Sequence, residues 1–152
     1  MDGLKVQYTD TNTWTQYILN SPINPNLSAK FKLKVVQTQH NNIMIGVTDY
    51  AKQKDQRYSY SSGNAMCYYG YDGSKSPSKD KEGGGFKQGD IFEVGINRAT
   101  STIKYSVNGT VNAIHTHDVL SDNSRVFMPY VEMHNTNDAV EWLMNDWWKQ
   151  IK

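Results

Sequence analysis

The chain has 152 residues, of which 38% are hydrophobic and 20% are charged, which is the composition of one folded domain rather than of a disordered segment. Its 16 basic and 15 acidic residues leave a formal charge of +1, so the basic excess of proteins that bind nucleic acid through phosphates is missing. No run of about 18 apolar residues occurs, which argues against a membrane-spanning helix. We therefore expect a single domain that engages neither nucleic-acid phosphates nor a membrane.

The chain contains one cysteine, Cys67, which cannot form a disulfide within the chain. The first ten residues, MDGLKVQYTD, lack the apolar stretch of a signal peptide. Both features favour an intracellular location, cytoplasmic or nuclear. Cys67 lies in an apolar run and is predicted to be a small buried hydrophobe rather than a nucleophile.

Alternating apolar residues predict β-strands along most of the chain. In the first such run, residues 30–36, Phe31, Leu33 and Val35 share one face and three lysines share the other. The further runs with strand character are residues 42–47, 65–71, 90–97, 102–107, 111–115, 126–133 and 139–144. Turn-rich stretches separate these short runs, and no helical periodicity precedes the last of them. This pattern predicts an all-β fold, an antiparallel sandwich of two sheets.

The best-defined turn is Asn108-Gly109, which lies between two alternating runs. This pair is typical of a two-residue type I′ hairpin, because both central residues adopt positive φ. On the two strands that precede the turn, one face is apolar throughout. The residues of that face, which we expect to point into the core, are Phe92, Val94, Ile96, Ile103, Tyr105 and Val107.

The end of the chain is ambiguous, because residues 138–152 fit both a helical face and a strand. We expect a strand to about residue 144, followed by a short aromatic tail, residues 145–152. Trp147 and Trp148 in this tail either fold over a sheet edge or contact another domain or subunit of a larger assembly. They are therefore a possible second interface.

Four stretches occur in a characteristic order: IMIGVTD, GGGFKQGDIFEVGINRATSTIKYSVNGT, FMPYVEM and DAVEWL. They resemble the Gly-Val strand, the Gly-Asp strand with its Asn-Gly hairpin, the proline-containing strand and the last strand of the SPRY domain, the core of the B30.2 module. With looser matches in TWTQYIL and FKLKVV, the resemblance spans about residues 14–144. It implies a concanavalin-like jelly roll over residues 1–152, and a non-enzymatic module that binds a protein or peptide through loops at one end.

SPRY domains of the SOCS-box type bind peptides with residues after the Gly-Val strand, in a tyrosine-containing loop and after the proline strand. Carried over to this chain, the resemblance implies a peptide site formed by Thr48, Asp49, Tyr69, Tyr71, His134 and Asn135. The two tyrosines would supply packing, and the other four side chains would bond to the backbone of an extended peptide.

Other chemistries find less support in the sequence. His115 and His117 share one face of a predicted strand, but no further cluster completes a metal site, so neither metal nor cofactor is expected. The Gly-x-Ser-x-Gly element of serine hydrolases is also missing. The alternative function is a carbohydrate-binding, lectin-like sandwich, in which Asp72, Asp80 and Asp90 could hold calcium. The lone cysteine and the missing signal peptide argue against a secreted lectin.

Overall fold

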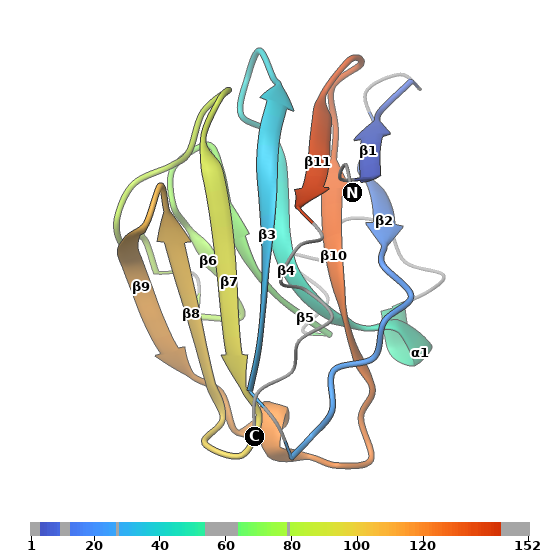
Figure 1. The fold of residues 1–152 in the computed structure, drawn as a ribbon, viewed down its shortest axis with the longest axis vertical. Helices are drawn as coiled ribbons and strands as arrows, with labels where there is room; N and C mark the ends of the chain where they lie inside the picture. The colour runs from blue at the N-terminus through green and yellow to red at the C-terminus, as the bar shows by residue number, and fades with distance from the viewer. Residues whose placement is uncertain (1–3, 10–12, 27, 54–63, 79, 144–152) are drawn as a thin grey trace.

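The computed structural model describes residues 4–9, 13–26, 28–53, 64–78 and 80–143, and within these residues two antiparallel sheets pack face to face (Figure 1). Sheet A contains, in spatial order, β1 (Leu4–Gln7), β11 (Ala139–Leu143), β3 (Ser28–Gln37), β7 (Ile91–Asn97), β8 (Thr102–Val107) and β9 (Thr110–Thr116). Sheet B contains β2 (Thr15–Ile18), β10 (Phe127–Met133), β4 (Ile43–Asp49), β5 (Ala65–Tyr69) and β6 (Lys75–Ser76). The predicted antiparallel sandwich is confirmed.

Helical structure in the described residues is limited to α1 (Tyr50–Gln53) and a 3₁₀ turn at Asp118–Ser121. Among the same residues, no helix has the length and apolar character needed to cross a membrane.

Sheet A turns one face to the core and the other to solvent, as its alternating sequence predicts. Along β3 the apolar residues Phe31, Leu33 and Val35 are at most 1% exposed, whereas the lysines between them lie on the outer face. The predicted apolar face of β7 and β8 is confirmed: five of its six residues are at most 2% exposed, and Val107 is partly buried against the same core.

The central strands β4 and β5 of sheet B are buried on both faces, which explains why they are continuous apolar runs rather than alternating ones. All seven residues of β4 are buried. Ile43, Ile45 and Val47 belong to the core between the sheets, while Met44 belongs to a second cluster on the other face of sheet B.

Cys67 belongs to the same second cluster and is fully buried. Burial raises the pKa of its thiol to about 12, so the sulfur stays protonated near neutral pH. The prediction of a small buried hydrophobe is confirmed. Beside Cys67, a Cβ atom at Gly46 would lie 1.9 Å from the carbonyl oxygen of Met66, so only glycine allows β4 and β5 to approach this closely.

The predicted hairpin between β8 and β9 is present, with φ of 50° at Asn108 and 84° at Gly109.

The packed core also extends further toward the N-terminus than the expected start at residue 14. β1 pairs with β11, and Tyr8 is fully buried. The sequence LKVQ did not indicate this strand because it has only four residues, too short a run to stand out, although its apolar residues Leu4 and Val6 alternate with polar ones. Trp147, Trp148 and the predicted tail, residues 145–152, lie outside the described residues.

Candidate functional site

The strand order of sheet B decides which loops meet at each of its ends. β4 runs antiparallel to both β5 and β10, so the beginning of β4 lies beside the ends of β5 and β10. Thr15 of β2 pairs with Met133 near the end of β10, which brings Trp14 to the same place. Four separate segments of the chain therefore converge at this end of sheet B.

Aromatic side chains line an open groove of about 380 Å³ at this end, which we name the aromatic groove; its walls are Trp14, Asn42, Tyr69 and His134. The Trp14 ring meets Tyr69 edge to face, with 6.0 Å between centroids, and lies 5.1 Å from the His134 ring. Tyr71 lies next to the groove, 6.0 Å from Tyr69, and is 65% exposed. Aromatic surface of this kind, rigid and partly open to solvent, is typical of recognition sites.

Side-chain amides form the polar part of the aromatic groove. The Tyr69 hydroxyl donates to Asn42 Oδ1 over 2.6 Å, and Asn42 Nδ2 donates to Asn135 Oδ1 over 2.8 Å. Within the described part of the chain, the Asn135 side-chain NH₂ makes no hydrogen bond, so it is available to a peptide carbonyl. His134 Nδ1 is buried, and none of the residues that the structure describes forms a hydrogen bond with it. Leaving a buried nitrogen unsatisfied costs free energy, a cost that a ligand donating to His134 Nδ1 would relieve.

The six residues predicted as one peptide site do not all come together. Tyr69, Tyr71, His134 and Asn135 meet at the aromatic groove, but Thr48 and Asp49 lie at the opposite end of sheet B. Both are buried, with 0% and 2% exposure. The expected convergence is therefore wrong for this pair. The physical reason is that β4 is antiparallel to its neighbours, so its last residues lie beside the first residues of β5 and β10.

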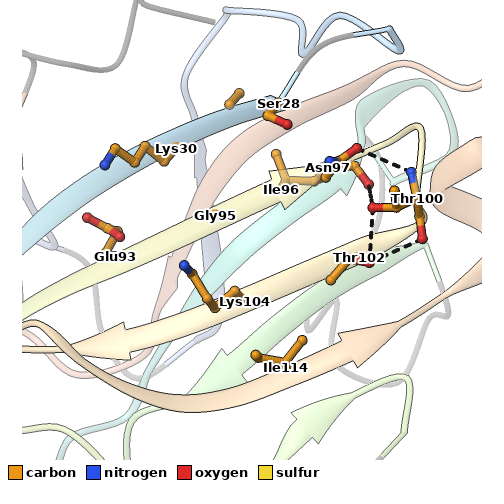
Figure 2. A pocket seen from close by; sticks show the side chains of 11 residues that line it. Ser28, Lys30, Glu93, Gly95, Ile96, Asn97, Thr100, Thr102, Lys104 and Ile114 are labelled. Carbon is orange, nitrogen blue, oxygen red and sulfur yellow. Dashed lines mark hydrogen bonds between the residues drawn. The ribbon is translucent and has the colours of Figure 1, made fainter. Parts of the chain in front are cut away.

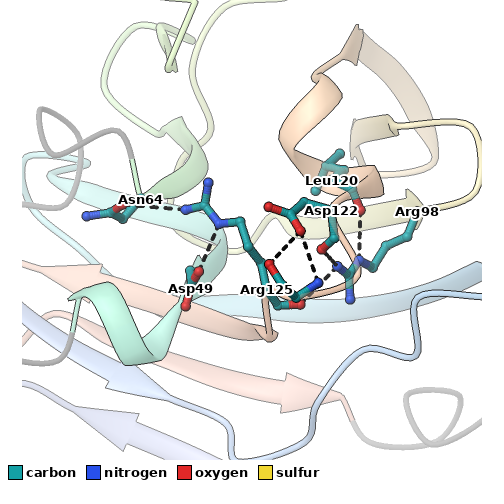
Figure 3. A network of polar contacts seen from close by, with 7 residues as sticks. Asp49, Asn64, Arg98, Leu120, Asp122 and Arg125 are labelled. Carbon is teal, nitrogen blue, oxygen red and sulfur yellow. Dashed lines mark hydrogen bonds and ion pairs between the residues drawn. The ribbon is translucent and has the colours of Figure 1, made fainter.

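Asp49 is committed to a structural contact at that opposite end. Its Oδ2 lies 2.8 Å from Arg125 Nε, and both side chains are largely buried. Arg125 Nη2 also reaches Asn64 Oδ1 over 3.5 Å (Figure 3). A carboxylate paired this closely has little capacity to bind a ligand as well.

A second arginine, Arg98, joins the loops at this end and is only 1% exposed (Figure 3). Its guanidinium group donates to four backbone carbonyl oxygens, those of Ile23, Leu120, Asp122 and Arg125, over 2.8–3.2 Å. The guanidinium groups of Arg98 and Arg125 both lie over the Phe127 ring, with their Cζ atoms 5.0 and 5.4 Å from its centroid. Burial lowers the pKa of Arg98 from its usual value.

We name Asp49, Arg98 and Arg125 the arginine cluster. The sequence gives no sign of this role, because Arg98 follows β7 directly and begins a turn, where a charged residue is usually solvated. A hollow of about 360 Å³ beside the arginine cluster is lined by Arg98, Arg125 and Val126, among others. The polar groups of Arg98 and Arg125 that border this hollow already bond to other groups of the chain.

The two histidines considered for a metal lie close together, His115 on β9 and His117 directly after it. Their rings stack with 5.8 Å between centroids, and His115 Nε2 lies 3.7 Å from Glu82 Oε2. Burial lowers the pKa of His117. Among the described residues, no group of three or more His, Cys, Asp or Glu side chains is arranged to hold a metal ion.

Two of the three aspartates considered for calcium, Asp72 and Asp90, are engaged in loop contacts, whereas Asp80 is exposed. Asp72 Oδ1 accepts from the Ser74 backbone N–H, and its Oδ2 lies 3.0 Å from Lys81 Nζ. Asp90 accepts from the Lys87 backbone N–H and from Asn108 Nδ2, each over 2.9 Å, and so links the turn before β7 to the hairpin between β8 and β9. These bonds give both carboxylates a structural role.

Neither family models nor curated protein sequences match the chain. Its structure is similar to those of solved SPRY domains. A crystal structure of a human SPRY domain aligns over 95% of this chain and 94% of its own, with a TM-score of 0.73 and 18% sequence identity. The SPRY domain of human HERC1 aligns over 87% and 83%, with a TM-score of 0.67 and 14% identity. The chain therefore has the SPRY fold, as its sequence motifs implied.

Proposed function

We propose that this chain with the SPRY fold is a protein-interaction module, without catalytic activity, that binds an extended segment of a partner protein in the aromatic groove. The observation that carries the proposal is the convergence of Trp14, Tyr69 and His134 from separate segments onto one open groove. A rigid sandwich that presents aromatic side chains from several loops is the usual arrangement of a recognition scaffold.

The chemistry of the aromatic groove favours an uncharged peptide segment. Of its four lining residues, none carries a formal charge while His134 is neutral. Flat aromatic rings pack well against proline and aliphatic side chains, and the Asn42 and Asn135 amides can bond to backbone carbonyls. We therefore expect a partner segment that is extended, apolar and poor in charged residues.

The partner is expected to be intracellular, cytoplasmic or nuclear, and the proposal includes a role for the chain as a subunit or domain of a larger assembly. The single cysteine supports the location, because secreted domains of this size usually carry disulfides. No direct contact with nucleic-acid phosphates or with a membrane belongs to the proposal.

Carbohydrate binding is the second candidate, because aromatic rings and amide groups together also suit a sugar ring. A calcium-dependent lectin would gain thermal stability from calcium, since a ligand that binds only the folded state raises the melting temperature. We expect calcium to leave the melting temperature unchanged. A clear upward shift would favour the lectin.

The test is affinity capture from cell extract with wild-type protein, Tyr71→Ala and Asn135→Ala, followed by affinity measurement on the purified partner. Leu4→Ala is the matched control, because Leu4 is also an exposed apolar residue, at 55%, but lies on β1 of sheet A. We expect Tyr71→Ala to weaken binding by about 1–2 kcal/mol, as at an interface hot spot, and Leu4→Ala to have no effect. Equal affinity for all four proteins, with folding intact, would place the interface elsewhere.

A further inference from the structure

The outer face of sheet A has a gap in its layer of side chains at Gly95. Cross-strand pairing places Gly95 between Lys30 of β3 and Lys104 of β8, and Lys104 in turn pairs with Ile114 of β9. Gly95 contributes no side chain, so a hollow of about 330 Å³ opens there. Figure 2 shows Lys30, Lys104 and Glu93 standing around it.

The charges around this hollow are unbalanced. Lys32 has a carboxylate partner, since its Nζ lies 3.6 Å from Glu93 Oε2. Lys30 and Lys104 are exposed and have no carboxylate within ion-pair distance among the described residues. Three lysines and one glutamate thus leave two positive charges uncompensated beside the hollow. Two like charges facing each other across a glycine favour an anion between them.

An apolar residue and a polar border complete the surface. Ile114 is 57% exposed on the edge strand β9, next to Lys104. On the other side, Asn97 and Thr102 join a set of hydrogen bonds through Thr100 (Figure 2). Exposed isoleucine beside unpaired lysines is suited to a segment that carries both a carboxylate and an aliphatic side chain.

We propose that this outer face is a second protein-binding surface, which takes an acidic, aliphatic segment of a partner. A glutamate or aspartate side chain enters the hollow at Gly95 between Lys30 and Lys104, and an aliphatic neighbour packs on Ile114. The surface lies on sheet A, whereas the aromatic groove belongs to sheet B, so this proposal does not depend on the proposed function.

A protein carboxylate fits this face better than a phosphate polymer or an anionic membrane. Glu93 lines the hollow, and Glu141 of β11 also lies on the outer face, opposite Lys34. These two carboxylates would repel an extended row of phosphates. A single inserted carboxylate meets Lys30 and Lys104 and leaves the Lys32–Glu93 pair intact.

The test is titration of ¹⁵N-labelled protein with an acetylated and C-terminally amidated pentapeptide of alternating leucine and glutamate, followed by amide chemical shifts. We expect shifts at Lys30, Gly95, Lys104 and Ile114, and about fivefold weaker binding when salt rises from about 0.05 M to about 0.5 M. The glutamine version of the peptide should cause no shifts at these amides. Equal shifts with both peptides, or shifts confined to other regions, would overturn the proposal.

Three variants distinguish the contribution of the two lysine charges to peptide binding from the contribution of the shape of the hollow. The double variant Lys30→Glu with Lys104→Glu should weaken peptide binding at least about tenfold, because both charges are reversed. Gly95→Val should also reduce it, since the valine fills the hollow, and a Cβ at Gly95 would meet its nearest atom, Lys104 Cε, at an unstrained 3.6 Å. Lys52→Glu, an exposed lysine on α1, is the matched control and should bind as wild type.

Two further outcomes bear on the class of partner. Tyr71→Ala should bind the glutamate peptide as wild type does, because Tyr71 lies beside the aromatic groove of sheet B and not on the outer face of sheet A. Phosphatidylserine vesicles that shift the same amides, in a protein that ignores the glutamate peptide, would assign the surface to a membrane and overturn the proposal. Unchanged peptide affinity in the double lysine variant would overturn it as well.

Discussion

At the end of sheet B where β4 begins, Trp14, Tyr69 and His134 line an open groove, whereas at the other end Asp49 pairs with Arg125 and Arg98 is buried among carbonyl oxygens. Both ends have polar side chains just beyond strands. They differ in what those side chains bind. In the arginine cluster, the guanidinium donors bond to the chain's own carbonyl and carboxylate oxygens. In the aromatic groove, the aromatic rings are partly exposed, and among the described residues the Asn135 side-chain NH₂ makes no hydrogen bond.

This contrast teaches that a polar residue at a strand end is not by itself a sign of a binding site. A hydrogen-bonding group that is already satisfied inside the protein would lose one partner to gain another, so it adds little affinity. An exposed aromatic ring has no such prior commitment and gains by being covered. The next four experiments test the difference, in order of decreasing effect.

Arg98→Ala should have the largest effect, on stability. It leaves four backbone carbonyl oxygens without their donor at a buried site, so we expect a loss of about 3–4 kcal/mol in the free energy of unfolding. Urea denaturation measures this loss. Arg98→Lys is the control: it keeps the charge but lacks the planar group of five donors, and should recover only part of the stability. A loss under about 1 kcal/mol for Arg98→Ala would mean that the cluster does not hold the loops together.

Asp49→Ala should cost about 1–3 kcal/mol of stability, because it leaves the largely buried Arg125 guanidinium without its carboxylate. Asp49→Asn keeps an oxygen acceptor for Arg125 Nε and should cost less. Thermal and urea denaturation measure both variants. Neither should change partner affinity once folded, since Asp49 lies at the opposite end from the aromatic groove. If folded Asp49→Asn bound the partner more weakly than wild type, Asp49 would belong to the binding site after all.

Tyr71→Ala should show the reverse pattern. Its side chain is 65% exposed, so we expect stability to change by less than about 0.5 kcal/mol, the range of ordinary surface substitutions. Affinity for the partner should fall by about 1–2 kcal/mol. Denaturation measures the change in stability, and calorimetric titration of the same preparation measures the change in affinity. A large stability loss without any change in affinity would make Tyr71 a structural residue and erase the contrast between the two ends.

Asp138 should give the smallest effect, one that depends on pH. It lies in the turn between β10 and β11, and burial raises the pKa of its carboxyl from the usual 3.8. The folded state therefore prefers the protonated acid, and the stability from this group is present below pH 3.8 and lost as pH rises through the folded pKa. Asp138→Asn should thus be more stable than wild type near pH 7, by less than about 1 kcal/mol, with the difference vanishing on acidification. A difference that stays constant with pH would contradict the raised pKa.

Much of the fold was accessible from the sequence, because its signals are local. Alternation in residues 30–36 identified β3 and its outer lysines, since side chains in a strand point to opposite faces in turn. Asn108-Gly109 identified the hairpin, because few other pairs tolerate two positive φ angles. The Gly-Val, Gly-Asp and proline motifs implied the SPRY fold, which the similarity to solved SPRY domains bears out. Tyr69, Tyr71, His134 and Asn135 were also found from these motifs as neighbours of strand ends.

The tertiary structure alone decided which strand ends share an edge. Nothing local in residues 43–49 tells whether Thr48 and Asp49 face His134 or Arg125, because the answer depends on the pairing of β4 with β5 and β10. The same holds for Trp14, which reaches the aromatic groove only because β2 pairs with β10, and for Arg98, whose burial requires the chain near Ile23 to meet that near Leu120. Contacts between residues far apart in the chain make these choices, and a local pattern carries no record of them.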